Sequence, residues 1–124
     1  GIQGVIMNRN TMDLYLAQEA PNDAMQTSEN QIFLSASTCD SERIRNHVID
    51  LGSSQELSLS GNPLALPNGA MLTFLLTDSQ VSGGHSGNAY VINCFDETNY
   101  SYINELVSSW TLLKKHKAVF FSVD

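Results

Sequence analysis

Charged residues are scarce in this 124-residue sequence, and basic residues are the scarcer of the two signs. Asp and Glu number 13 against 6 Lys and Arg, which gives a formal net charge of −7. Nucleic-acid binding draws on a broad basic face that neutralises phosphates. The sequence therefore predicts no nucleic-acid partner, whereas a cationic protein or a neutral ligand such as a glycan stays compatible with the charge.

Long apolar runs are also missing. The strongest one, residues 70–76, is interrupted by Thr73, and a membrane-spanning helix needs roughly 20 apolar residues. No membrane insertion is predicted. The chain opens with Gly1, without an initiating Met or a basic-then-apolar leader. That start indicates a processed or truncated chain.

Cysteine is rare, and the two that occur fit no metal or redox spacing. They are Cys39 and Cys94. A disulfide between them would close a loop of about 55 residues and stabilise the fold by roughly 4 kcal/mol. We expect this disulfide, with two buried free thiols as the alternative. Together with a surface rich in neutral polar side chains, it favours a secreted or periplasmic location.

Apolar periodicity predicts mostly strands. We expect a hairpin of strands at 4–7 and 12–17, a surface loop at 19–30, and a mobile Gly-rich loop at 82–87. Further strands are expected at 31–36, 56–60, 71–77, 88–94 and 118–123. Residues 39–51 stay open between two structures. They could form a short helix capped by Ser41, with Ile44, Val48 and Leu51 on one stripe, or a strand at 47–51.

The clearest element is an amphipathic helix from about residue 98 to 114. Ile103, Val107 and Trp110 recur at helical spacing, and acidic and basic residues lie at the ends that the helix dipole favours. These elements predict one domain, residues 1–124, of β-rich α+β class. We expect a small twisted antiparallel sheet or a partly open, OB-like barrel, with one main amphipathic helix near the C-terminus.

No group of residues points firmly to catalysis. Residues 84–87, Gly-His-Ser-Gly, only partly match a nucleophile elbow, because the next position is Asn88. His47, His85 and His116 lie in different predicted elements, and no spacing suits zinc. We therefore expect no catalytic residue, no metal, no cofactor and no enzyme activity.

Aromatic residues near the C-terminus offer the only candidate ligand site. Tyr90, Tyr100, Tyr102 and Trp110 lie within a short span, and tyrosine combines an apolar ring with a polar tip. Trp110 fits the helix core better than a surface. Tyr100 and Tyr102, with Asn99 as a hydrogen-bond partner, are therefore the candidate ligand-binding residues.

Residues 88–124 run in the order strand, cysteine, acidic cap, amphipathic helix and closing strand. This stretch resembles the helix-and-strand unit in the OB-fold B subunits of secreted bacterial AB5-type toxins. The resemblance covers under a third of the chain. It implies a homo-oligomeric ring that binds host-cell glycans, but no motif matches a glycan site residue by residue.

The function predicted from the sequence is an extracytoplasmic, non-catalytic binding module, for example a glycan- or protein-binding subunit of a secreted assembly. One alternative is an acidic inhibitor or immunity protein that neutralises a cationic enzyme. Another is the globular head of a pilin-like surface subunit. A last alternative is a small enzyme that uses Asp96, Glu97 or His85 in a site assembled by the fold.

Overall fold

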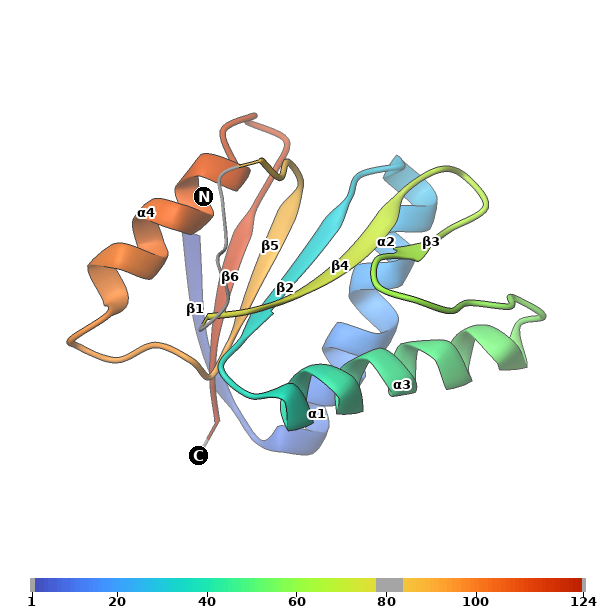
Figure 1. Ribbon diagram of the computed structural model, residues 1–124, viewed down its shortest axis with the longest axis horizontal. Coiled ribbons are helices and arrows are strands. Elements are labelled where there is room, and N and C mark those ends of the chain that lie inside the picture. The colour runs from blue at the N-terminus through green and yellow to red at the C-terminus, as the bar shows by residue number, and fades with distance from the viewer. Residues whose placement is uncertain (1, 78–83, 124) are drawn as a thin grey trace.

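The computed structural model describes residues 2–77 and 84–123, which contain one six-stranded sheet (Figure 1). In spatial order its strands are β1 (Ile2–Met7), β6 (Ala118–Val123), β5 (Asn88–Ile92), β2 (Gln31–Ser35), β4 (Met71–Leu76) and β3 (Leu64–Ala65). The first five run parallel, and the short β3 pairs antiparallel with β4. The carboxyl ends of the five parallel strands therefore meet at one edge.

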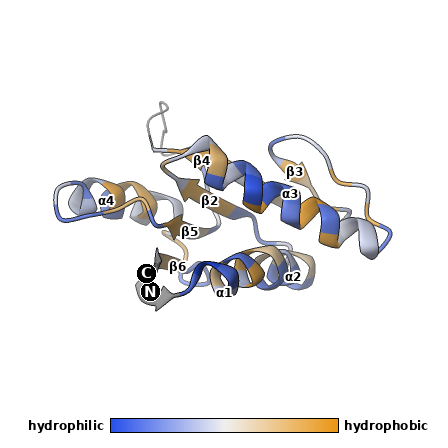
Figure 2. Ribbon diagram, turned by 90° about the horizontal axis from the view of Figure 1, so that it is seen from below, coloured by the Kyte–Doolittle hydropathy of each residue, from blue (hydrophilic) through white to orange (hydrophobic). Residues whose placement is uncertain are grey.

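Helices cover both faces of this sheet. They are α1 (Arg9–Leu14), the wider π-type turn η1 (Tyr15–Glu19), α2 (Ala20–Thr27), α3 (Thr38–Ser54) and α4 (Tyr100–Trp110). Figure 2 shows α1, α2 and α3 on one side of the sheet and α4 on the other. Parallel strands need such crossovers, because the chain must return to the same end of the sheet before the next strand begins.

Each face of the sheet has its own apolar core. On the face of α1 to α3, Phe33, Phe74 and Tyr90 form a ring stack. On the face of α4, Trp110 and Val107 pack against the sheet and are fully buried. Because both faces are covered, β2 and β5 are buried at every position.

The coarse expectation of a chain with both helices and strands is confirmed, but the arrangement of the strands is corrected. The sheet is mostly parallel, where an antiparallel sheet or an OB-like barrel was expected. The chain also has more than one main helix. The longest of the described helices is α3, and α4 is shorter than the predicted helix at residues 98–114. That residues 1–124 form a single domain stays a prediction.

The predictions of an N-terminal hairpin and of a surface loop at 19–30 are wrong, because residues 9–27 form one continuous helical stretch. Met12, Leu16, Ala20 and Ala24 recur at every fourth position and are all buried. That spacing places them on one helix face. Pro21 has no backbone N–H to donate to the preceding turn, and the wider turn η1 comes just before it.

The structure settles one segment that the sequence left open, residues 39–51, and corrects another, residues 56–60. Residues 39–51 lie inside α3, whose first turn is capped by Ser37 and not by Ser41. Residues 56–60, which the structure describes in full, form no strand. Their alternating Leu57 and Leu59 are half-buried, with Leu59 packed on Gly52 of α3. Residues 82 and 83 of the expected mobile loop lie outside the described residues.

The predicted disulfide is absent, since the structure has both cysteines as free thiols. Cys39 is exposed in the first turn of α3, whereas Cys94 is buried just after β5. The Cys94 thiol donates to the carbonyl of Leu34 at 3.6 Å. Burial raises the pKa of Cys94 to about 11, so its reactive thiolate form is rare at neutral pH.

We therefore expect the two thiols to react at very different rates. In the folded chain a water-soluble disulfide reagent should modify Cys39 promptly and leave Cys94 intact, because Cys94 is buried and protonated. Denaturant should then release the second thiol. Colorimetric thiol counting before and after unfolding measures this. If the unfolded chain showed no reactive thiol at all, Cys39 and Cys94 would have to be joined in a disulfide, which would contradict the structure.

Candidate functional site

The carboxyl edge of the sheet contains a topological switch point. The chain leaves β2 for α3 on one face, and it leaves the adjacent strand β5 for α4 on the other face (Figure 2). In parallel α/β sheets, ligands bind in the crevice that such diverging connections leave outside the strand ends. This edge of the sheet is therefore the candidate functional site.

Of the helices that follow strands at this edge, α1 and α3 are each capped by a side chain that directly precedes the helix. The backbone N–H of Thr11 in α1 donates to Asn8 Oδ1 at 2.8 Å. The backbone N–H of Asp40 in α3 donates to Ser37 Oγ at 3.0 Å. Each cap satisfies a backbone donor that would otherwise point to solvent or to a ligand.

Four charged side chains join α1 to the N-terminal part of α3, and we call them the edge cluster: Arg9, Asp13, Asp40 and Arg43. Arg43 donates from Nε and Nη2 to the two carboxylate oxygens of Asp13, at 3.1 Å each. Its Nη1 donates to Asp40 Oδ1 at 2.5 Å, and Arg9 Nη1 reaches the same oxygen at 3.1 Å. Two positive and two negative groups make the cluster neutral overall.

The electrostatics of the edge cluster keep Arg43 and Asp40 charged. The hydrogen bond to Asp13 raises the pKa of Arg43, against the opposing effect of burial. Burial alone would raise the pKa of Asp40, but the hydrogen bond and charge of Arg43 outweigh it, and the pKa is lowered. A paired Arg and a paired carboxylate both stay ionised at neutral pH.

The opposite, amino edge of the sheet carries a second polar network around a cavity of about 230 Å³. Tyr90 donates its hydroxyl to Gln31 Oε1 at 2.6 Å, and both Gln31 and Asn88 donate to Asp23 Oδ2. Burial of its ring raises the pKa of Tyr90. These groups satisfy one another, as buried polar groups must.

An ion-pair group flanks the same cavity. Glu29 contacts Lys115 Nζ and His116 Nε2, at 2.7 Å each. The hydrogen bond from Lys115, followed by that from His116, lowers the pKa of Glu29. His116 is buried, which was not expected from the sequence. Asp23 and Asn88 lie 65 residues apart in the chain, so no local pattern could have paired them.

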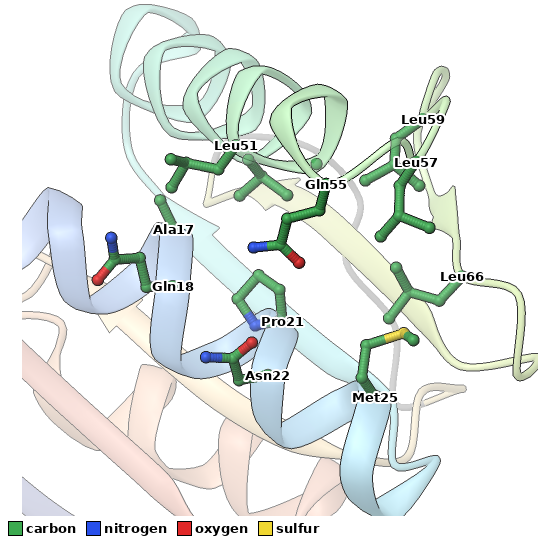
Figure 3. A pocket seen from close by; sticks show the side chains of 12 residues that line it. Ala17, Gln18, Pro21, Asn22, Met25, Leu51, Gln55, Leu57, Leu59 and Leu66 are labelled. Carbon is green, nitrogen blue, oxygen red and sulfur yellow. The ribbon is translucent and has the colours of Figure 1, made fainter.

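A groove of about 250 Å³ lies between α2, α3 and the segment that leads to β3. Figure 3 shows leucine side chains and Met25 along one wall, with Gln55 reaching toward Pro21. Its rim includes the amides of Gln18, Asn22 and Gln55. The groove is apolar with neutral edges and brings no titratable groups together.

The sequence-predicted ligand residues lie at the start of α4. Tyr100 and Tyr102 are exposed, and the Tyr100 ring contacts Phe95 and Phe120. The Asn99 amide is used within the chain, since it accepts from the Asp96 N–H and donates to the Cys94 carbonyl. A ligand role for Tyr100, Tyr102 and Asn99 stays a prediction.

Three further observations concern metal ligands, His85 and membrane-spanning helices. Within residues 2–77 and 84–123, no three His, Cys, Asp or Glu side chains gather as metal ligands. His85 instead contacts the ring of Trp110 edge-on, at a centroid distance of 5.7 Å. Of the helices in the described part of the chain, none has the length and apolar character for crossing a bilayer.

Comparison with known proteins gives a consistent result. The family described as "Terminase large subunit, T4likevirus-type, N-terminal" matches residues 14–122. Two curated relatives are each 33% identical over 109 residues, 87% of this chain. They are the probable terminase, ATPase subunit, of Haemophilus phage HP1 and the terminase, ATPase subunit, of Escherichia phage P2. The chain spans 18% of the length of either relative.

The fold has a counterpart among solved structures. The crystal structure of the HK97 bacteriophage large terminase aligns with 98% of this chain and 29% of its own, with a TM-score of 0.75 and 13% sequence identity. At that identity the likeness concerns the fold alone. It supports the parallel sheet and does not support the OB-like barrel of a toxin B subunit.

These findings overturn most of the functional expectations from the sequence. The resemblance to AB5-type toxin B subunits is wrong, and so are the extracytoplasmic binding module, glycan binding, and a secreted or periplasmic location. The inhibitor and pilin-like alternatives fall with them. Excluding enzyme activity and nucleic acid was also wrong, since the relatives are terminase ATPase subunits. The chain belongs to the family of T4-like-virus-type terminase large subunits, within their N-terminal region.

Proposed function

We propose that the chain is part of a phage terminase large subunit and works in packaging phage DNA inside the host cell. Its partners would then be double-stranded DNA and other terminase subunits. Because the curated relatives are named ATPase subunits, the assembled terminase would couple ATP hydrolysis to packaging. The family match over residues 14–122 carries this proposal.

The fold is compatible with the same proposal. A parallel sheet with helices on both faces is shared with the HK97 bacteriophage large terminase. The net charge of −7 belongs to these 124 residues alone. The relatives are far longer, so contacts to DNA phosphates can come from other parts of the subunit.

A matched pair of aspartate substitutions in the phage gene tests the packaging role. Val91→Asp places a charge in the fully buried centre of β5, and Leu112→Asp places the same charge where the side chain is 80% exposed. An unpaired buried carboxylate strongly destabilises a core. We expect Val91→Asp to abolish DNase-resistant phage DNA in infected cells and Leu112→Asp to leave it unchanged.

The readout separates packaging from other defects. Total phage DNA and capsid yield, measured by quantitative PCR and electron microscopy, should be equal for the two variants. Normal amounts of DNase-resistant DNA with a destabilised Val91→Asp protein would disprove the packaging role. A loss of phage DNA synthesis or of capsids in place of packaging would disprove it too.

A further inference from the structure

The terminase relatives are ATPase subunits, so the carboxyl edge can be compared with a phosphate site. P-loop ATPases hold nucleotide phosphates at the start of the helix after a strand. The loop reads Gly-x-x-x-x-Gly-Lys-Ser/Thr, and its backbone N–H groups and lysine contact the phosphates. Here residues 7–13, which join β1 to α1, read Met-Asn-Arg-Asn-Thr-Met-Asp. They contain neither glycine nor lysine.

The start of α1 is also closed to an anion. A single residue, Asn8, separates Met7 of β1 from Arg9 of α1. The carboxamide oxygen of Asn8 already accepts the Thr11 N–H, at the point where a phosphate oxygen would accept it. With only six residues, α1 lends little dipole of its own.

The two arginines at this edge are already neutralised. Asp13 occupies two donors of Arg43, and Asp40 lies within hydrogen-bonding distance of both Arg43 and Arg9. The Asp13 side chain is only 14% exposed, so its pairing with Arg43 is partly shielded from solvent. A phosphate group would have to displace a carboxylate to bind either arginine.

The central strands also lack the acid that a magnesium nucleotide requires. P-loop enzymes hold Mg²⁺ with an aspartate at the end of a strand. After β2 the chain continues with Ala36 and Ser37, and after β5 it continues with Asn93 and Cys94. None of these four residues is acidic. The described residues at the ends of β1, β2 and β5 therefore do not fit an ATP phosphate site.

We infer that the edge cluster is an internal clasp between α1 and α3, standing where a P-loop ATPase binds phosphates. The inference rests on the proposed function, because a role in a terminase ATPase is the reason to ask where ATP binds. Nucleotide hydrolysed by the assembled terminase is then held by groups outside residues 7–13 and 37–43. The clasp fixes the relative position of α1 and α3, which are two of the helices that cover one face of the sheet.

Photolabelling of the full-length subunit tests where the phosphates lie. The probe is ATP with a photoreactive aryl azide on the γ-phosphate, used with Mg²⁺ and with unlabelled ATP as competitor. Labelled peptides are mapped by mass spectrometry. We expect no competed label in residues 7–13 or 37–43. Saturable, competed label within either segment would overturn the inference and leave the packaging proposal intact.

A double-mutant cycle tests the clasp itself. Asp13→Asn and Arg43→Met should each lower the melting temperature, and the double variant should lose less than the sum of the two, because each single variant breaks the same pair. Asp13→Asn combined with Glu42→Gln is the control. Glu42 is exposed on α3 and should show additive effects. Additive effects for Asp13 and Arg43 would overturn the clasp.

Discussion

Truncation of Phe33 to alanine should lower the free energy of unfolding by about 3–5 kcal/mol, the range typical of buried aromatic side chains. Phe33 is 1% exposed in the central strand β2. Its ring stacks on Phe74 at a centroid distance of 4.6 Å and on Tyr90 at 5.2 Å. The cavity would open between three strands and the helices above them, where the paired sheet has little room to collapse.

Phe95→Ala is the matched control for this prediction. It removes the same atoms from a half-buried ring after β5, so it loses less apolar burial. Urea unfolding followed by circular dichroism gives both free energies, with the slope of the transition as a check on compactness. Equal losses for Phe33→Ala and Phe95→Ala would show that the ring stack is not the centre of this core.

The strands were largely predictable from the sequence, but their direction was not. Apolar residues in β2, β4, β5 and β6 mark segments that bury side chains. Alternation indicates how many faces of a strand are covered, not which way its neighbours run. The unbroken run of Ile32, Phe33 and Leu34 carried a signal that was overlooked, since strands buried on both faces occur mainly in parallel sheets.

The N-terminal helices were missed because alanine carries half of their apolar face. Met12 and Leu16 alone fit a strand or a helix, and only Ala20 and Ala24 extend the spacing over more than three helical turns. Pro21 and its polar neighbours favoured a loop at the same place. In the fold Pro21 lies inside the continuous helical stretch, soon after the wider turn η1 that precedes α2.

The candidate site was beyond sequence reasoning for a different physical reason. Arg43 and Asp13 are 30 residues apart, and only the fold, which places α1 and α3 on the same face of the sheet, brings them together. The Asn8 cap was visible in principle, because Asn commonly precedes a helix. Its interpretation depended on recognising the helix. Net charge is a weak guide to partners, since the chain spans only 18% of the length of its curated relatives.

Truncation of Trp110 to alanine should destabilise the opposite face by a similar amount, about 3–5 kcal/mol. Trp110 is the largest fully buried side chain in the described residues. It ends α4, contacts the ring of His85, and its carbonyl accepts the N–H of Gly87 just before β5 begins. Removing the indole would therefore loosen α4 and the entry into a central strand together.

Tyr102→Ala serves as the control on the same helix, because its side chain is 58% exposed. The two variants remove aromatic side chains from one helix and differ in burial, so the difference between them isolates packing from helix propensity. Circular dichroism must report the unfolding, since Trp110 is the only tryptophan in the sequence. If Trp110→Ala lowers the free energy of unfolding no more than Tyr102→Ala does, α4 does not depend on its contact with the sheet. The apolar core on the α4 face would then be contradicted.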